Sequence, residues 1–267
     1  MDFKNKQWAF ILGGSGSFGL AAAKILALKG FNLILVFRER KSTLEIINQE
    51  FELLEKKTNL IKINLNSNET DNQEKILSIL VENDSIKNNI SFLLHSIADG
   101  NLRPLFFNKT DEIEGLNLDD FNHTIKSMGT SLLEWTQILY SNNLFSDNAS
   151  ILGLTSEGSS KVFKDYAAVA AAKSVMESNM HYIAVELAQY GIRANLINAG
   201  ITDSRALKAF PNYDNFISKA KERNPMGRLT TADDVAKVIS FMASEDSAWI
   251  NGAIITVDGG EQLLSIF

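Results

Sequence analysis

The segment Gly13-Gly-Ser-Gly-Ser-Phe-Gly19 follows a short apolar run, Trp8-Ala-Phe-Ile-Leu12, and precedes an Ala-rich stretch. This order predicts a buried strand, a tight turn and a helix. Gly14, Gly16 and Gly19 match G-x-G-x-x-G, whose glycines let the backbone approach a pyrophosphate at the helix N-terminus. A dinucleotide-binding loop is therefore predicted, with a purely structural turn as the alternative. A Walker loop is excluded because no Lys-Ser or Lys-Thr pair follows the glycines.

Strand and helix patterns alternate along the rest of the chain. Strands are expected at 8–12, 31–37, 60–65, 90–96, 149–154, 192–197 and 253–257, and helices at 20–29, 43–57, 72–82, 118–140 and 165–190. This rhythm predicts right-handed crossovers and an α/β fold. We expect a single doubly wound parallel sheet, Rossmann-like, with helices on both faces and ligands at the carboxyl ends of the strands. Residues 1–267 lack a linker and are expected to form one domain, with the irregular stretch 202–228 as a lid.

Composition excludes several classes of protein. The chain has 267 residues, 45% of them hydrophobic, which argues against disorder. No apolar run approaches the roughly 20 residues of a membrane-spanning helix. It has no Cys and only three scattered His, so neither disulfides nor a metal site are expected. The net charge of −6 argues against nucleic acid or an anionic membrane as a partner. A cytoplasmic location is expected.

The end of the second expected strand addresses the choice of dinucleotide. The residues there are Phe37-Arg38-Glu39-Arg40-Lys41, in which three cations flank one carboxylate. A site for NAD uses a carboxylate on the ribose 2′-hydroxyl, whereas a site for NADP uses cations on the 2′-phosphate. The sequence therefore favours NADPH over NADH, with Arg38 and Arg40 as contacts. A solvated loop that binds nothing is the alternative.

Tyr166 and Lys173 stand in the expected helix 165–190, downstream of Thr155-Ser156-Glu157-Gly158 at the end of a strand. Seven residues make two helical turns, so both side chains would project from one face about 10 Å apart. Such a phenol and ammonium could act together on a bound dinucleotide. The alternative is a core tyrosine and an unrelated surface lysine.

At this point the chain resembles the short-chain dehydrogenase/reductase superfamily over essentially its whole length. Besides the glycine loop, the resemblance is carried by Asn64-Leu65, His95-Ser96-Ile97-Ala98, Tyr166 to Lys173, Asn198-Ala-Gly-Ile-Thr-Asp-Ser204 and Val257-Asp-Gly-Gly260. Ordinary members place the lysine four residues after the tyrosine, where this chain has Ala170. Tyr-x6-Lys and His-Ser-Ile are similar instead to the enoyl-[acyl-carrier-protein] reductase branch. Arg205-Ala-Leu-Lys-Ala-Phe-Pro-Asn212 and Asn224-Pro-Met-Gly-Arg228 resemble its NADPH-using bacterial members.

The resemblance implies an activity and a set of roles. The activity is NADPH-dependent reduction of the C=C bond of an enoyl thioester on acyl carrier protein, in fatty-acid-type synthesis. Tyr166 would stabilise the thioester oxygen, and Lys173 would bind the nicotinamide ribose and lower the pKa of Tyr166. The other implied or predicted contacts to the dinucleotide are Gly13, Ser15, Ser17, Phe18, Gly19, Asn64, Leu65, Ser96, Ile97, Gly200, Thr202 and Ser204. A homotetramer built on the helices at 118–140 and 165–190 is also implied.

One departure from this branch concerns the substrate. Enoyl reductases usually carry another tyrosine upstream of the catalytic one, but the candidate positions here are Ser156 and Val162. The expected substrate contacts are therefore Ser156, Phe163 and, in the lid, Phe210. Reduction of a carbonyl and a non-catalytic NADP-binding role remain open. Residues 205–228 carry six cations against two carboxylates, which suggests a basic surface for an acidic carrier protein, or merely a solvated face.

Overall fold

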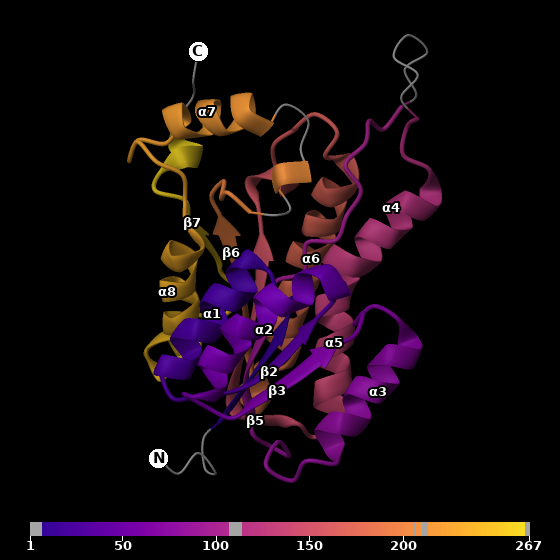
Figure 1. Ribbon diagram of the computed structural model, residues 1–267, viewed down its shortest axis with the longest axis vertical. Coiled ribbons are helices and arrows are strands. Elements are labelled where there is room, and N and C mark those ends of the chain that lie inside the picture. The colour runs from indigo at the N-terminus through magenta and orange to yellow at the C-terminus, as the bar shows by residue number, and fades with distance from the viewer. Residues whose placement is uncertain (1–6, 107–113, 205–206, 210–212, 265–267) are drawn as a thin grey trace.

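Seven parallel strands form one sheet in the order β3-β2-β1-β4-β5-β6-β7 (Figure 1). The computed structural model describes residues 7–106, 114–204, 207–209 and 213–264. The strands are β1 (Trp8–Leu12), β2 (Asn32–Phe37), β3 (Leu60–Asn64), β4 (Ile90–His95), β5 (Phe145–Thr155), β6 (Arg193–Ala199) and β7 (Ile254–Val257). The α-helices are α1 (Ser17–Leu28), α2 (Lys41–Glu55), α3 (Thr70–Val81), α4 (Leu118–Ile125), α5 (Ser131–Ser141), α6 (Ala167–Glu186), α7 (Tyr213–Arg223) and α8 (Ala232–Met242). The predicted doubly wound sheet is confirmed.

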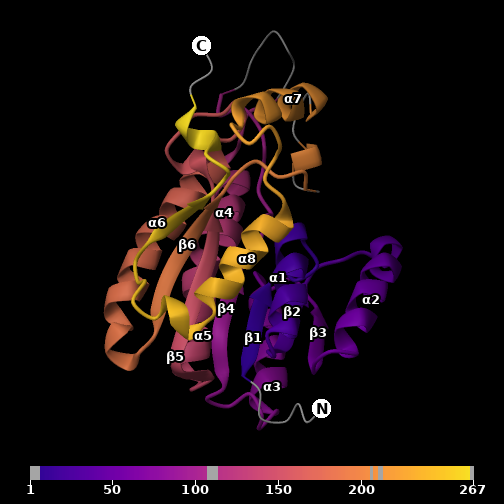
Figure 2. The same cartoon turned by 90° about the vertical axis from the view of Figure 1, so that its left-hand side faces the viewer.

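Helices cover both faces of the sheet, which explains why the strands β1, β2 and β4 are mostly apolar and buried along their whole length. Successive strand residues point to opposite faces. In β1, Phe10 and Leu12 join a core formed with α3, α5 and α6, while Ala9 and Ile11 join a second core formed with α1, α2 and α8. Figure 2 shows the sheet between these two layers.

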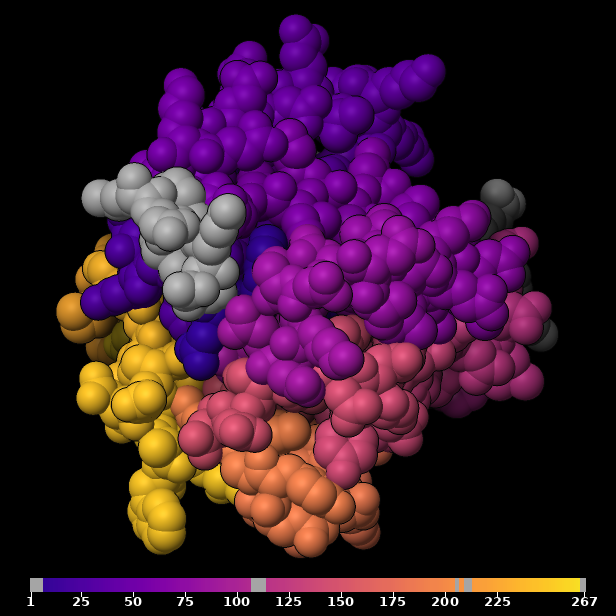
Figure 3. All heavy atoms as spheres, turned by 90° about the horizontal axis from the view of Figure 1, so that it is seen from below, coloured from indigo at the N-terminus to yellow at the C-terminus, as the bar shows by residue number. Residues whose placement is uncertain are grey.

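The order of the strands places a switch point between β1 and β4. The chain runs outward from β1 to β3 and then returns to β4 on the other side of β1. Ligands of doubly wound sheets bind at the carboxyl ends of the strands beside such a point. Seen from below, the N-terminal half, in indigo and purple, lies to one side and the orange and yellow C-terminal elements to the other (Figure 3). Helix α7 lies beyond the carboxyl ends of the strands (Figures 1 and 2).

Two of the expected helices differ from the structure by more than a shift of their end residues. The expected helix 165–190 begins only at Ala167, because Asp165 has a left-handed backbone (φ +60°) and Tyr166 is the cap residue. It ends at Glu186 and is followed by a separate 3₁₀ turn, Ala188–Tyr190. The expected helix 118–140 is interrupted by a π-helical turn at Lys126–Thr130. Such turns are frequent at functional sites.

Helix α8 was missing from the sequence-based prediction. Its N-terminus carries a capping box, in which Thr231 accepts from the backbone of Asp234 and the Asp234 side chain accepts from the backbone of Thr231. The spacing Thr-x-x-Asp before an apolar stretch was a usable signal for a helix start. The irregular stretch 202–228 likewise contains α7.

Candidate active site

Two adjoining cavities open at the carboxyl ends of the strands. The larger encloses about 1030 Å³ between the glycine loop, the ends of β2 and β3 and the turn after β4. The smaller encloses about 310 Å³ between the loops after β4, β5 and β6 and the helix α7. Phe18, Ala98, Asp99 and Ser204 line both cavities, so the two are continuous.

The two cavities draw on different parts of the chain. Among the described residues, every wall residue of the larger cavity lies at or before Asp99, apart from Ser204. Every wall residue of the smaller cavity lies at or after Ala98, apart from Phe18. The first half of the chain therefore builds one cavity and the second half builds the other.

The glycine loop has the close backbone approaches that its sequence predicts. Gly13 has φ +83°, and a Cβ atom there would lie 2.7 Å from the carbonyl oxygen of Ser96. A Cβ atom on Gly19 would lie 2.2 Å from the carbonyl oxygen of Gly13. The N-cap of α1 is Gly16, so no capping side chain covers the helix N-terminus. A pyrophosphate fits here, because backbone N–H groups and the helix dipole both favour an anion.

Charged residues meet at the end of β2. The carboxylate of Glu39 accepts from Ser15 Oγ at 2.8 Å and from Thr43 Oγ1 at 2.7 Å. Arg38 Nη2 donates to Asp99 Oδ1 at 3.2 Å, across the larger cavity. Arg40 is the N-cap residue of α2 and also lines that cavity. Two arginines and the Glu39 carboxylate thus line the same cavity. The sequence alone could not show how close together these opposite charges lie.

Ten of the predicted dinucleotide contacts line the larger cavity. In the larger cavity the structure brings together Gly13, Ser15, Ser17, Phe18, Arg38, Arg40, Leu65, Ser96, Ile97 and Ser204. Gly200 and Thr202 line the smaller cavity instead. Asn64 lines neither, because its side chain accepts from the backbone N–H of Glu39 and donates to the Glu39 carbonyl. Asn64 therefore stabilises the backbone at the end of β2. Gly19 lines neither cavity, but its lack of a side chain allows the close approach to the Gly13 carbonyl within the loop.

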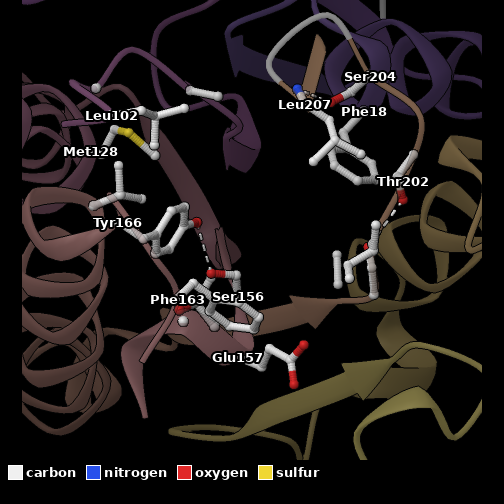
Figure 4. Close-up of a pocket in the computed structure, with 18 of the residues that line it drawn as sticks. Phe18, Leu102, Met128, Ser156, Glu157, Phe163, Tyr166, Thr202, Ser204 and Leu207 are labelled. Atoms are coloured by element: carbon white, nitrogen blue, oxygen red, sulfur yellow. Dashed lines mark hydrogen bonds between the residues drawn. The ribbon is translucent and has the colours of Figure 1, made fainter. Parts of the chain in front are cut away.

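The smaller cavity is mostly apolar, with the hydroxyl groups of Tyr166 and Ser156 together on one wall. Its walls include Phe18, Leu102, Met128, Phe163, Val169, Ile201, Leu207 and Phe216. Figure 4 shows Tyr166 and Ser156 joined by a hydrogen bond and facing Phe18 and Leu207 across the open space. Tyr166, Ser156 and Phe163 thus line one cavity, whereas Phe210 lies outside the described residues.

Tyr166 is held on both sides. Its hydroxyl shares a hydrogen bond of 3.2 Å with Ser156 Oγ. Below the ring, a Cβ atom on Gly158 would lie 2.3 Å from Tyr166 Cε1, so only glycine leaves room for the ring. Burial raises the pKa of Tyr166, which the Ser156 hydrogen bond lowers and Glu157 raises further. The expected lowering of the Tyr166 pKa is therefore wrong, and the phenol is protonated at neutral pH.

Lys173 lies deeper than the spacing argument implied. Its side chain is buried, and Nζ donates to the Leu154 carbonyl oxygen at 2.7 Å. It lines neither cavity, because this hydrogen bond holds Nζ at a buried backbone carbonyl. Burial lowers the pKa of Lys173 to about 8, against a smaller opposing effect of Glu177. The ammonium is therefore buried near the carboxyl end of β5, outside the cavity that Tyr166 lines.

His95 completes the polar groups under this end of the sheet. It is fully buried, and its Nε2 lies 2.6 Å from Ser131 Oγ. Ser131 Oγ in turn donates to the Ser127 carbonyl in the π-helical turn. Burial and the charge of Lys173 lower the pKa of His95 to about 3, so the imidazole is neutral. A packing role fits this arrangement.

Sequence reasoning missed several wall residues, among them Asp99, Gly100 and Met128. Asp99 and Gly100 directly follow the quoted segment His95–Ala98 and could have been found by extending it. Met128 comes from the π-helical turn, and only the fold brings it to the cavity. Within the described residues, no group of three or more His, Asp or Glu side chains could hold a metal ion. No described helix is both long and apolar enough to cross a bilayer.

Comparison with known proteins assigns the class of protein. The sequence profile of the family described as Enoyl-(Acyl carrier protein) reductase matches residues 13–262. The chain therefore belongs to this family, and it is an NAD(P)H-dependent oxidoreductase.

Particular relatives differ in dinucleotide. The chain is 27% identical, over 92% of its length and 93% of the relative's, to the NADH-dependent enoyl-[acyl-carrier-protein] reductase of Enterococcus faecalis. It is 24% identical, over 97% and 98%, to the NADPH-dependent enzyme of Staphylococcus aureus. A 1-cyclohexenylcarbonyl-CoA reductase of Streptomyces collinus is 32% identical, over 46% of this chain and 44% of its own.

A solved structure supports the fold. The enoyl-[acyl-carrier-protein] reductase (NADH) of Aquifex aeolicus superposes over 100% of both chains with a TM-score of 0.83 at 22% identity. At that identity the likeness concerns the fold alone.

Proposed function

We propose that this protein reduces the C=C bond of an enoyl thioester with NADPH. The observation that carries the proposal is the Tyr166 hydroxyl in an apolar cavity that is continuous with the dinucleotide cleft. Apolar walls suit an acyl chain, and the shared wall residues would bring the chain beside the bound dinucleotide. Membership of the family supports the same reaction.

The residues around the cavity suit this chemistry. Bound NADPH would supply a hydride to the β-carbon of the enoyl group, which places negative charge on the thioester oxygen. The Tyr166 hydroxyl would donate a hydrogen bond to that oxygen and stabilise the enolate. Its raised pKa keeps the proton on the phenol until the charge develops. The buried ammonium of Lys173 would favour the same anion through its field.

We infer that residues 202–228 form a lid over the acyl group. Thr202, Leu207 and Phe216 contribute to the walls of the smaller cavity from this stretch. Apolar cover excludes water, which strengthens the hydrogen bond from Tyr166 to a developing charge. The chain is proposed to act as one domain, with this lid as its substrate-binding part.

The choice of NADPH rests on the cations at the end of β2, and we expect Arg38→Ala to test it. Arg38 lines the dinucleotide cleft, whereas Glu39 beside it would repel a 2′-phosphate. Arg38→Ala should weaken NADPH binding about tenfold and leave NADH binding unchanged within about twofold, because only NADPH carries the phosphate. The Kd values follow from nicotinamide fluorescence. Glu39→Gln is the matched control and should move NADPH affinity the other way. Equal losses of both dinucleotides in Arg38→Ala would contradict the assignment.

We propose acyl carrier protein as the thioester carrier, and the exposed lysines of the lid offer a test. Arg223 and Arg228 of this stretch are bound to carboxylates of the protein itself, whereas Lys208, Lys219 and Lys221 are exposed. Lys219→Glu with Lys221→Glu should raise KM for an acyl-carrier-protein substrate about fivefold at low salt, because acidic partners are steered by basic surfaces. The effect should fade at high salt.

The matched control for the carrier uses the coenzyme A thioester of the same acyl group, for which KM should stay unchanged in the double variant. An equal rise for both carriers would contradict docking at this surface. Unchanged kinetics with the carrier protein at low salt would contradict it as well.

Reduction of a carbonyl is the second candidate, and the hydrogen bond between Ser156 and Tyr166 favours it, because two hydroxyls can bind one carbonyl oxygen. One assay separates the two reactions. Purified protein is mixed with NADPH and either crotonyl or acetoacetyl thioester, and the absorbance of the reduced nicotinamide is followed. Oxidation with crotonyl thioester alone supports the proposed function. Oxidation with acetoacetyl thioester alone supports carbonyl reduction, and oxidation with neither indicates a binding protein.

We also propose a homotetramer built on α4, α5 and α6, as the family resemblance implies. Tyr182 and Val185 on α6 expose 67% and 76% of their surface in the single chain, which suits an interface. Gel filtration with light scattering tests the assembly state.

A further inference from the structure

A single arginine joins two buried glutamates at the edge of the smaller cavity. Arg223 is the last residue of α7, and its Nη2 donates to both Glu157 Oε1 and Glu261 Oε1. Glu157 exposes 6% of its surface and Glu261 none. Arg223 lies 66 positions after Glu157 and 38 before Glu261, so these contacts join segments that are distant along the chain.

The segments joined in this way are three walls of the cavity. Glu157 lines the cavity from the turn after β5, and Phe216 lines it from α7. Glu261 Oε2 accepts from the backbone N–H of Ile201 at 3.0 Å, and Ile201 lines the cavity from the loop after β6. One guanidinium group therefore holds α7 against both loops.

The same contact reaches the catalytic tyrosine. Glu157 stands between Ser156, which is hydrogen-bonded to the Tyr166 hydroxyl, and Gly158, which lies under the Tyr166 ring. Fixing the Glu157 carboxylate fixes the backbone on which both of these contacts depend.

Without Arg223, two carboxylates would share a buried site. Lys161 Nζ also donates to Glu157 Oε2, at 2.9 Å, but its side chain is 46% exposed, against 19% for Arg223. Burial already raises the pKa of Glu261. Removing one partner of a buried charge network leaves uncompensated charge, so the two glutamates would separate or take up a proton. Either change releases α7 from the turn after β5.

We propose that Arg223 is a positioning residue for the acyl cavity, and that its bridge to Glu157 and Glu261 holds α7 closed over the substrate. The proposal rests on the proposed function in naming an acyl thioester as the occupant. Neither Arg223 nor the two glutamates line the dinucleotide cleft. The bridge therefore acts on the binding of the acyl substrate and leaves the binding of the dinucleotide alone.

The first test is Arg223→Met, which keeps the aliphatic bulk and removes the charge. KM for the enoyl thioester should rise about tenfold or more, while the Kd for NADPH stays within about twofold of its original value. Lys24→Met is the matched control, because it breaks the ion pair of Lys24 with Glu50, between α1 and α2 and outside both cavities. It should change neither constant. Equal losses of thioester and dinucleotide binding in Arg223→Met would indicate general destabilisation and overturn the proposal.

The second test separates positioning from charge burial. The variant used combines three substitutions: Arg223→Met, Glu157→Gln and Glu261→Gln. It lacks both the buried charges and the ion pairs that form the bridge. Its melting temperature should recover toward that of the original protein while KM for the thioester stays high. If KM recovers as well, the bridge has no positioning role and the proposal fails.

A third measurement is independent of the reaction. In the protein without substrate, amide hydrogen exchange in residues 213–223 should be about tenfold faster in Arg223→Met, with β1 to β4 unchanged. Unchanged exchange in α7 would overturn the proposal even if the enzyme is active. If the original protein reduces no enoyl thioester, this experiment still decides whether Arg223 holds α7.

Discussion

Replacing Tyr166 with Phe is expected to lower kcat/KM for an enoyl thioester by about 10²–10³-fold, because one preorganised hydrogen-bond donor to the developing anion is lost. The apolar ring keeps its place above Gly158, so the fold and the cavity should persist. The loss should therefore fall on kcat, with the Kd of NADPH unchanged. Steady-state kinetics with crotonyl thioester and fluorescence titration of NADPH measure the two quantities.

Tyr190→Phe is the matched control for this variant. Tyr190 lies in the 3₁₀ turn after α6, is 51% exposed and lines neither cavity, so removing its hydroxyl should leave the kinetics unaltered. Turnover of Tyr166→Phe at the original rate would remove Tyr166 from the mechanism and make the neighbouring Ser156 hydroxyl the next candidate donor.

Replacing Lys173 with Met is expected to lower activity and to raise stability. Loss of the buried ammonium removes a field that favours the enolate, and kcat should fall about 10²-fold. The fold, in contrast, carries a desolvation cost for the charged lysine, whose pKa is lowered to about 8 from its ordinary value of 10.5. Met fills a similar volume without charge, so the free energy of unfolding at pH 7 should rise by on the order of 1–3 kcal/mol.

The stabilisation expected in Lys173→Met depends on pH. Between pH 8 and 10.5 the unfolded chain holds a proton on Lys173 that the folded protein has released, so the stability of the original protein rises with pH in this window. Below pH 8 the cost is fully present, and above 10.5 it has vanished. The advantage of Lys173→Met should accordingly shrink between these values. Urea unfolding at pH 7 and pH 9.5 measures it, and a destabilised variant at pH 7 would contradict the prediction.

Much of the sheet could be predicted from the sequence because strands buried on both faces are continuous apolar runs. Short apolar segments such as β1, β2 and β4 have no other stable placement than between two helical layers. Helix ends were harder to predict. Nothing in the composition of Asp165-Tyr166 announces the left-handed backbone that starts α6 only at Ala167. Helix α8 was missed although its capping box was visible.

The site was predictable wherever a local motif carries the chemistry. The glycine loop and the strand ends at Arg38 and Ser96 owe their positions to the sheet, and they line the cleft as expected. Lys173 differs because its depth depends on where α6 begins and on the Leu154 carbonyl that receives it. The Glu157–Arg223–Glu261 contact depends on three loops that only the complete fold brings together.

The division of the two cavities between the halves of the chain bears on how such an enzyme can diversify. Substitutions after Asp99 can reshape the smaller cavity, which we propose for the acyl group, while the larger cavity keeps its walls, apart from Ser204 among the described residues. Recombination at a crossover near residue 100 would therefore exchange substrate preference between related reductases and leave the choice of electron donor with the N-terminal parent. Phe18 and Ser204 line both cavities from opposite halves of the chain, so their neighbours would have to be matched in such a hybrid.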